Sequence, residues 1–238
     1  MFKPKSLTYE IDTAGLSMND VVELHKSLFV RKDYDWWYEI LPDDIVVDVG
    51  AGVGSFAAKA LDAGAKKVFM IEPNRRLLKT AIKNVSDHIM DAPEQRVFPI
   101  NAAMGRTDID RAGTYESQVY KEIDHEPKLM SLGELVEYHD LQTIDYLKVD
   151  AAGAEFSILY YENRDYLMTQ VRFIAVKVNL QSTYGGNEKF IEWKDRFLKP
   201  CRDQNRLFFQ DESLIEKLFH PRWWEHVPMN FICYIKNW

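Results

Sequence analysis

The sequence predicts an α/β fold in which strands and helices alternate around a mostly parallel sheet. Apolar runs of strand length recur from residue 45 onwards, and stretches with helical periodicity separate them. The first run leads directly into a glycine-rich turn and a helix start over Val46–Ser55, with the sequence VVDVGAGVGS. Regular alternation of strand and helix is typical of parallel sheets. A strand, a glycine turn and a helix N-terminus together form a cradle for a nucleotide-like ligand.

The segment before the sheet differs in composition from the rest of the chain. Residues 1–44 are predicted to be an N-terminal helical and aromatic extension, and residues 45–238 a single α/β domain. Apolar positions at helical spacing predict a helix over Met18–Phe29, with Ser17 or Asn19 as its N-cap.

The remaining elements follow from apolar runs bounded by turn residues. Asn74 is a suitable N-cap for the second helix of the sheet region, and Gly64 is well placed to end the first. A polar stretch with glycines, residues 101–120, is compatible with a hairpin. The predicted strands are Ile45–Val49, Lys67–Ile71, Arg96–Ile100, Ile144–Val149, Arg172–Val178, Leu207–Gln210 and Phe231–Ile235. The predicted helices are Ser55–Ala63, 74–85, Leu132–Tyr138, Glu155–Tyr161 and a segment marked by Phe190, Trp193 and Phe197.

Composition excludes several classes of function. The net charge of −7 and the lack of a basic run disfavour a nucleic-acid partner, because such binding depends on clustered lysine and arginine. Cys201 and Cys233 are predicted to be buried free thiols in a reducing compartment, and no histidine pair has the spacing of metal ligands. Without an apolar leader or a run of membrane-spanning length, we expect a cytoplasmic protein with no membrane partner.

The glycine turn indicates which ligand the cradle binds. A dinucleotide fingerprint has glycine at its first, third and sixth positions, and the sixth position here is Ser55. Asp48 lies two residues before the first glycine, where a carboxylate would repel phosphate and attract a cation or a hydroxyl. A ligand with a ribose and a positive centre fits better, and S-adenosylmethionine is such a ligand. We therefore predict cofactor contacts at Asp48, Gly50, Gly52 and Gly54, and we consider an NAD-dependent enzyme the weaker alternative.

Two further strand ends supply cofactor candidates. Glu72 ends the second strand, where its carboxylate can accept hydrogen bonds from both ribose hydroxyls. Asn101 and the adjacent Ala102 follow the third strand. The amide of Asn101 offers donors and an acceptor that suit an adenine edge, although an asparagine that caps a turn is an equally good interpretation.

Acidic and basic residues at the fourth and fifth strand ends are the catalytic candidates. Asp150 ends the fourth strand and faces the predicted ligand edge, so it is the first candidate for a general base. Lys177 interrupts an apolar strand; it would act as a base only if burial lowered its pKa, and otherwise would hold an anionic acceptor. Glu155 is interpreted as a first-turn helix residue that complements the helix dipole. No metal site is predicted.

These motifs resemble class I S-adenosylmethionine-dependent methyltransferases, and within that class the FkbM family. The resemblance covers roughly residues 45–180. It is carried by Asp48–Gly54, by Ile71–Asn74, by Ser131–Leu135 and by Ile144–Asp150 with the Gly153-Ala154-Glu155 that follows. It implies a Rossmann-like, doubly wound, seven-stranded sheet whose last strand is antiparallel, and it makes residues 45–238 the methyltransferase domain.

The resemblance also implies O-methylation of a sugar, a glycan or another small molecule. Two positions depart from the family pattern: Ala152 and Lys177 stand where FkbM proteins usually carry acids. The alternative is therefore a non-catalytic protein that binds S-adenosylmethionine. Tyr34–Tyr38 and Phe219–Met229 are candidate acceptor-side elements by elimination, although the first can equally be packing against the sheet edge. Nothing in the sequence indicates an oligomeric state.

Overall fold

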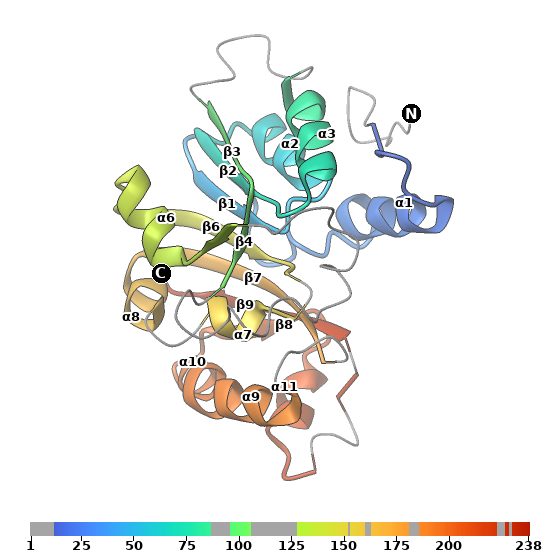
Figure 1. Cartoon of the computed structure of the whole chain (residues 1–238). Helices are drawn as coiled ribbons and strands as arrows, with labels where there is room; N and C mark the ends of the chain where they lie inside the picture. Colours follow the sequence, from blue (N-terminus) through green and yellow to red (C-terminus); the bar gives the residue numbers. More distant parts are fainter. Residues whose placement is uncertain are drawn as a thin grey trace. The chain divides into compact units, whose positions relative to one another are not determined.

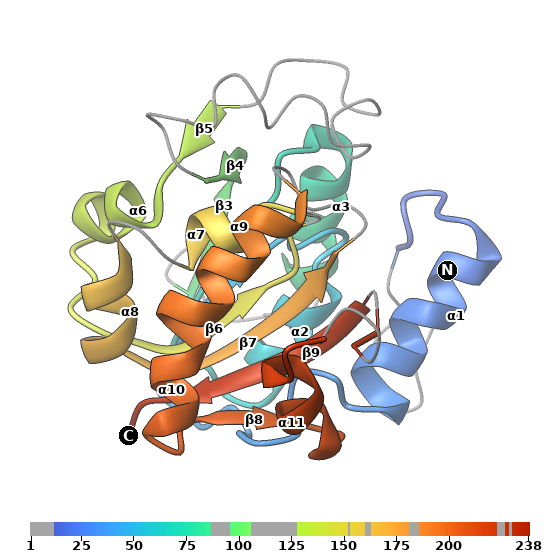
Figure 2. The ribbon, with the colours of Figure 1, turned by 90° about the horizontal axis from the view of Figure 1, so that it is seen from below.

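The structure contains one sheet of seven described strands and a separate pair of strands. The computed structural model describes residues 12–86, 96–105, 128–151, 153–159, 163–180, 186–222, 227–228 and 230–238. Seven of the described strands form one sheet in the order β3-β2-β1-β6-β7-β9-β8 (Figure 1). β4 and β5 form a separate pair (Figure 2). The strands are β1 (Ile45–Val49), β2 (Lys67–Ile71), β3 (Val97–Ile100), β4 (Ala102–Met104), β5 (Lys128–Met130), β6 (Ile144–Val149), β7 (Val171–Asn179), β8 (Leu207–Phe209) and β9 (Asn230–Lys236).

Strand direction agrees with the predicted class. β1 pairs with β2 and β2 with β3 in parallel, whereas β9, the last strand of the chain, is antiparallel to both β7 and β8. The predicted seven-stranded, mostly parallel, Rossmann-like sheet is therefore confirmed.

Helices and helical turns connect the strands. They are α1 (Met18–His25), η1 (Lys26–Val30), α2 (Ser55–Asp62), α3 (Arg75–Ser86), α6 (Leu132–His139), α7 (Glu155–Ile158), α8 (Arg164–Thr169), α9 (Gly186–Trp193), η5 (Lys194–Leu198), α10 (Lys199–Asp203) and α11 (Ser213–Phe219), where η denotes a π-helical turn. No described helix is both long enough and apolar enough to cross a membrane.

The chain divides into two compact units, and the first contains the glycine turn. It comprises residues 1–103, 123–128 and 144–148. In this unit α2 and α3 lie side by side (Figure 1). β1 and β2 are almost entirely buried, which agrees with sequences that are apolar apart from Asp48 in β1 and Lys67 in β2.

The second unit comprises residues 104–122, 129–143 and 149–238. In it α9, η5 and α10 follow one another as a continuous rod (Figure 2). The aromatic residues predicted to mark this rod, Phe190, Trp193 and Phe197, are all buried, and Trp193 contacts both phenylalanine rings. Their helical spacing therefore marks the face of this helical segment that packs into the core.

Local signals in the sequence located most elements. The bounds of β1, β2 and β6 agree with the prediction to the residue. The Ser17 hydroxyl caps α1 by accepting a hydrogen bond from the Asp20 amide, and the Asn74 side chain accepts from the amides of Arg76 and Leu77 at the start of α3. Most of the predicted hairpin over residues 101–120 and the end of the predicted helix Glu155–Tyr161 lie outside the described residues.

Candidate functional site

The glycine turn, Gly50–Gly54, closes against the end of β2. The amides of Gly50 and Ala51 both donate to the carbonyl of Ile71, at 3.0 and 3.1 Å. Gly52 and Gly54 have φ of +55° and +80°, a backbone region that favours glycine. A side chain at Gly54 would lie 2.9 Å from Ala81 on α3, whereas one at Gly52 would meet no atom within 4 Å. Gly54 thus lets α2 start close to α3, and Gly52 leaves open space beside the turn.

Glu72 is attached to this turn by its carboxylate. One oxygen accepts from the amide of Gly52 and the other from the amide of Asn74, each at 2.9 Å. The side chain is buried, and this burial raises the pKa of Glu72 above its usual value. Each carboxylate oxygen can accept about two hydrogen bonds, so Glu72 can hold the turn and still accept from a ligand hydroxyl. The predicted ribose-binding role is compatible with this placement.

Replacing Glu72 with alanine is expected to weaken S-adenosylmethionine binding about 10- to 100-fold, because charge-assisted hydrogen bonds contribute about 1.5–3 kcal/mol. Isothermal titration calorimetry of the purified protein measures the change. The exposed Glu39, replaced in the same way, serves as the control and should leave affinity within about twofold. Equal affinity of the wild type and Glu72→Ala would show that Glu72 does not bind the cofactor.

Asn101 holds the turn that follows β2. Its amide nitrogen donates to the carbonyls of Glu72 and Pro73, at 3.0 and 2.9 Å, and its oxygen accepts from Arg75 at 3.2 Å. Both amide hydrogens therefore have backbone partners. Of the two interpretations left open by the sequence, this geometry favours the turn-holding one. The neighbouring Ala102 is fully buried at the start of β4.

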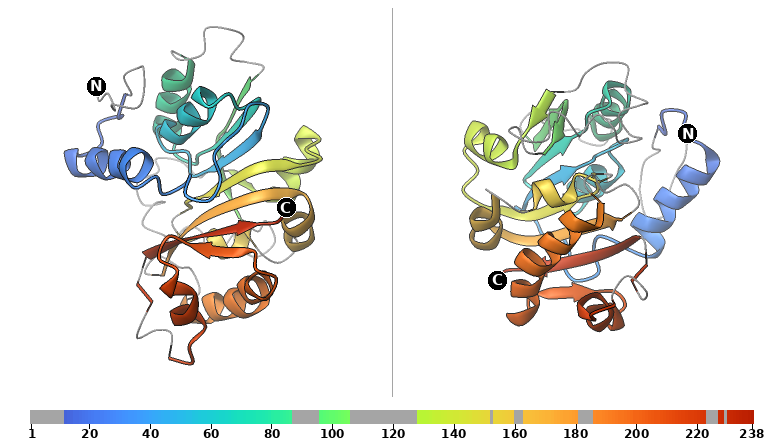
Figure 3. Two further views of the ribbon diagram at one scale, coloured as in Figure 1. Left: turned by 180° about the vertical axis from the view of Figure 1, so that it is seen from behind. Right: turned by 60° about the horizontal axis from the view of Figure 1, so that its bottom comes forward.

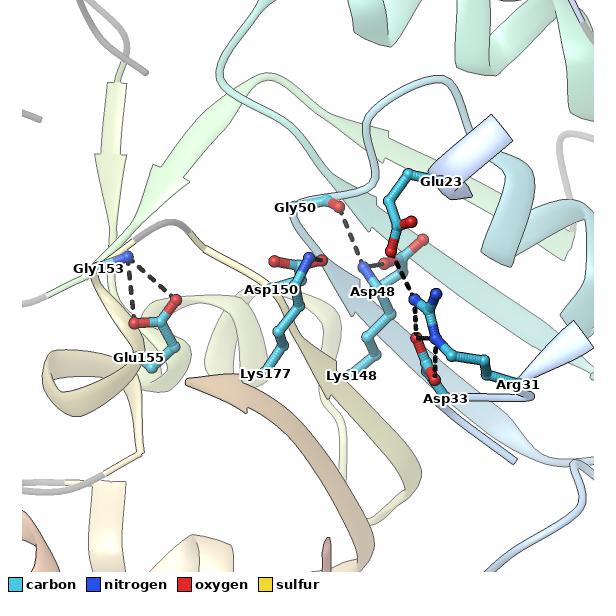
Figure 4. A network of polar contacts seen from close by, with 10 residues as sticks. All are labelled: Glu23, Arg31, Asp33, Asp48, Gly50, Lys148, Asp150, Gly153, Glu155 and Lys177. Atoms are coloured by element: carbon cyan, nitrogen blue, oxygen red, sulfur yellow. Dashed lines mark hydrogen bonds and ion pairs between the residues drawn. The ribbon is translucent and has the colours of Figure 1, made fainter. Parts of the chain in front are cut away.

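Asp48 forms an ion pair with Lys148, a pairing that the sequence analysis did not predict. The ammonium group of Lys148 donates to the Asp48 carboxylate at 2.7 Å and to the carbonyl of Gly50 at 3.1 Å (Figure 4). It also lies 5.3 Å from the centre of the Tyr34 ring and 5.6 Å from that of Phe56. The positive charge that Asp48 was expected to attract is thus supplied by β6. The signal in the sequence was a lysine between Leu147 and Val149, in the apolar second half of β6.

The two catalytic candidates lie together in the second unit. The ammonium group of Lys177 is 3.3 Å from the Asp150 carboxylate (Figure 4). Their side chains are 43% and 31% exposed, so a solvent-borne molecule can reach them, and Lys177 lacks the burial that a base role would require. Ala152, the other position that departs from the family pattern, lies outside the described residues.

Amide side chains extend the face that carries Lys177. Residues two apart in a strand share a face, so Asn179 lies on the same face of β7 as Lys177. In the β7–β9 register Asn179 is opposite Asn230, which places Asn230 on that face too. This end of the strand pair is therefore polar, although the middle of both strands is mainly apolar and buried.

Glu155 is a buried carboxylate whose environment the sequence did not reveal. It begins α7, as expected, but it is fully buried, and both of its oxygens accept from the amide of Gly153 at 3.0 and 3.1 Å. Burial raises the pKa of Glu155 to about 7, and the nearby charge of Asp150 contributes in the same direction. Gly153 has φ of +111°, so glycine is required where the loop turns back to this carboxylate.

The raised pKa of Glu155 makes stability depend on pH. The folded protein binds the Glu155 proton up to about pH 7 and the unfolded chain only up to about pH 4.5, so the contribution is present below pH 4.5 and is lost as the pH rises through 7. Between pH 5 and 8 the loss is about 2–3 kcal/mol in the free energy of unfolding. Glu155→Gln should remove this pH dependence in urea titrations, and Glu192→Gln on α9 should retain it. An unchanged pH slope in Glu155→Gln would contradict the assignment.

Within the described ranges, no group of three or more His, Cys, Asp or Glu side chains is arranged to hold a metal ion. The described polar residues thus form two groups. The first unit carries the glycine turn, Glu72 and the Asp48–Lys148 pair; the second carries the Asp150–Lys177 pair and Glu155.

Comparison with known proteins identifies the family. The family model for the methyltransferase FkbM domain matches residues 48–207, which is more than half of the chain. No curated protein sequence matches the chain significantly.

One solved structure shares the fold at low sequence identity, and two more align with TM-scores below 0.5. The methyltransferase FkbM from Methylobacillus flagellatus KT aligns at 16% identity over 88% of this chain, with a TM-score of 0.55. This chain covers 47% of that protein, so it spans about half its length. The METTL16 methyltransferase domain aligns at 13% identity, with a TM-score of 0.46, over 98% of this chain and 74% of its own. The N-terminal domain of human METTL16 in complex with S-adenosylhomocysteine aligns at 12% identity, with a TM-score of 0.41, over 98% and 73%.

The fold of the structure and the match of the family model therefore agree. The chain belongs to the family of methyltransferase FkbM domains.

Proposed function

We propose that this protein is an S-adenosylmethionine-dependent O-methyltransferase that acts on a hydroxyl of a sugar, a glycan or another small molecule. The observation that carries the proposal is the Asp150–Lys177 pair, a partly exposed carboxylate beside a cation at the end of β6. Such a carboxylate can remove a proton from a hydroxyl, and deprotonation is what an oxygen acceptor requires and a more nucleophilic amine does not.

The residues of the first unit fit S-adenosylmethionine. The open space beside Gly52 and the remaining acceptor capacity of Glu72 suit a ribose, and the ammonium group next to Gly50 is already neutralised by Asp48. We infer that the Gly50–Gly54 turn and Glu72 hold the cofactor. When bound, S-adenosylmethionine supplies a methyl group on a positively charged sulfur.

The chain's own groups supply the proton chemistry and the orientation. In the proposed reaction Asp150 would take the proton from the acceptor hydroxyl, and the oxygen would receive the methyl group that bound S-adenosylmethionine would supply. Lys177 orients the acceptor and balances the charge of Asp150. A positioned general base typically accelerates such a step about 100- to 10,000-fold.

Hydroxyl-rich acceptors are supported by the polar face around Lys177. Asn179 and Asn230 present amides that both donate and accept, as a sugar hydroxyl does. The Lys177 ammonium adds donors beside the Asp150 acceptor.

Two alternatives make different predictions in one experiment. The protein is incubated with S-adenosylmethionine labelled at its methyl group and with sugar-rich extracts, and label is followed into the extract and into the protein-bound cofactor. Transfer of label into carbohydrate supports the proposal. Binding without any transfer supports a non-catalytic S-adenosylmethionine-binding protein, and failure to bind S-adenosylmethionine contradicts both.

A further inference from the structure

A buried asparagine on α3 joins the N-terminal segment to the glycine turn. The side chain of Asn84 is almost fully buried, and its amide nitrogen donates to the carbonyl of Val53 in the turn at 2.7 Å. The same nitrogen donates to the carbonyl of Asp12 at 2.8 Å, and the Asn84 oxygen accepts from the amide of Asp12 at 2.8 Å. Asn84 thus contacts backbone on both sides, from residues 31 and 72 positions away.

The side chain of Val53 is surrounded by the same N-terminal segment. Val53 is buried, and apolar residues of the segment pack against it together with Leu77 of α3. The contributing residues of the segment are Ala14, Leu16, Leu24 and Phe29. The middle of the glycine turn is therefore held at its carbonyl by Asn84 and at its side chain by residues 14–29.

Further contacts fix the segment to the elements that flank the turn. The ammonium group of Lys59 on α2 donates to the carbonyl of Leu28 at 2.9 Å and forms an ion pair with Asp35. Tyr34 packs edge-on against Phe56 of α2. α1 lies on the side of the first unit that carries α2 and α3 (Figure 3).

From these contacts we propose that Asn84 is a positioning residue for the cofactor turn, and that residues 12–38 form an N-terminal clamp whose docking is coupled to cofactor binding. The proposal rests on the proposed function, in which this turn binds S-adenosylmethionine. Asn84 touches no reacting atom, and it acts through the position of Val53.

The glycines of the turn explain how clamp docking can improve cofactor affinity. Three glycines at positive φ allow the free turn many conformations, and fixing each residue of a backbone costs roughly 1–2 kcal/mol of entropy. When the clamp is docked, Val53 is already fixed. Cofactor binding then loses less backbone entropy in the turn. Because coupling between two binding events is reciprocal, the cofactor must stabilise clamp docking by the same factor with which the clamp improves cofactor affinity.

The test measures both directions of this coupling. In Asn84→Leu, which keeps the size and removes all three hydrogen bonds, we expect the Kd for S-adenosylmethionine by calorimetry to rise about tenfold. In the wild type, S-adenosylmethionine should slow amide hydrogen exchange in residues 12–30 about tenfold, and in Asn84→Leu this protection should disappear. A purely structural asparagine would lower stability without this reciprocal change in protection.

Asn163→Leu is the matched control. Asn163 is equally buried and bonds the carbonyl of Ile158 within the second unit. It should lose stability while keeping Kd within twofold and clamp protection intact. Leu24→Ala loosens the clamp from Val53 without altering α3, and it replaces Asn84→Leu if that variant does not fold.

The outcomes separate the two proposals. The clamp proposal alone would be overturned by three results together. The wild type binds S-adenosylmethionine, Asn84→Leu or Leu24→Ala leaves the Kd unchanged, and amide exchange in residues 12–30 does not respond to the cofactor. A wild-type protein that binds no S-adenosylmethionine would overturn the proposed function and the coupling with it.

Discussion

Replacing Asp150 with asparagine is expected to lower the rate of methyl transfer by about 100- to 10,000-fold, the range that a positioned general base contributes. Asparagine keeps the size of the side chain and a partner for Lys177, but it cannot take a proton from a hydroxyl. Single-turnover transfer of a labelled methyl group, measured at saturating S-adenosylmethionine, reports this step directly. The Kd for S-adenosylmethionine should stay within about threefold, because Asp150 is not assigned to the cofactor.

Asp165→Asn provides the control for this measurement. The side chain of Asp165 on α8 is 97% exposed and forms an ion pair with the neighbouring Arg164. The same chemical change at this exposed position should leave the rate of methyl transfer unaltered. If Asp150→Asn keeps more than about a tenth of the wild-type rate, Asp150 is not the base.

Replacing Lys148 with methionine is expected to lower the free energy of unfolding by about 3–5 kcal/mol, the loss typical of removing one partner of a buried ion pair. The side chains of Lys148 and Asp48 are 5% and 0% exposed, and the substitution leaves the Asp48 charge buried without its ammonium partner. Methionine has a similar length, so packing against Tyr34 and Phe56 is largely retained. Urea unfolding followed by circular dichroism measures the change.

Two further variants isolate the buried charge. Lys217→Met removes an ammonium group from an exposed pair with Asp211, whose side chains are 42% and 60% exposed, and should change stability by less than about 1 kcal/mol. Asp48→Asn combined with Lys148→Met removes both charges and should regain part of the loss. A single Lys148→Met variant as stable as Lys217→Met would show that the pair contributes no more than a surface contact.

The strands could be predicted from the sequence because each strand depends mainly on residues that are close together in the chain. Val46–Val49, apart from Asp48, and Val68–Ile71 are apolar runs that end at turn residues, and such runs define buried strands without reference to the rest of the chain. The glycine spacing and Glu72 are local in the same sense, since the two strand ends adjoin in any parallel α/β sheet. The placement of Glu72 beside the glycine turn could therefore be predicted, and the cofactor contacts assigned to these residues stay predictions.

Long-range pairings could not be read from the sequence. Lys148 and Asp48 are 100 residues apart in the sequence, and Asn84 and Asp12 are 72 residues apart. The residues next to Lys148 or Asn84 in the sequence do not indicate these partners. The burial of Glu155 follows from packing around α7, and a glutamate at a helix start is ordinarily solvated. The short helices α8 and α11 were missed because six or seven residues show too little periodicity.

A thermal-shift comparison of cofactors tests whether the Gly50–Gly54 turn and Glu72 bind S-adenosylmethionine. At 100 times Kd a ligand stabilises the folded state by about 2.7 kcal/mol. For a chain of this size that corresponds to a rise in Tm of about 5–10 °C. We expect S-adenosylmethionine and S-adenosylhomocysteine to produce this rise in the wild type and a smaller one in Glu72→Ala, and NAD to produce none. Stabilisation by NAD without stabilisation by S-adenosylmethionine would show that this turn does not bind S-adenosylmethionine.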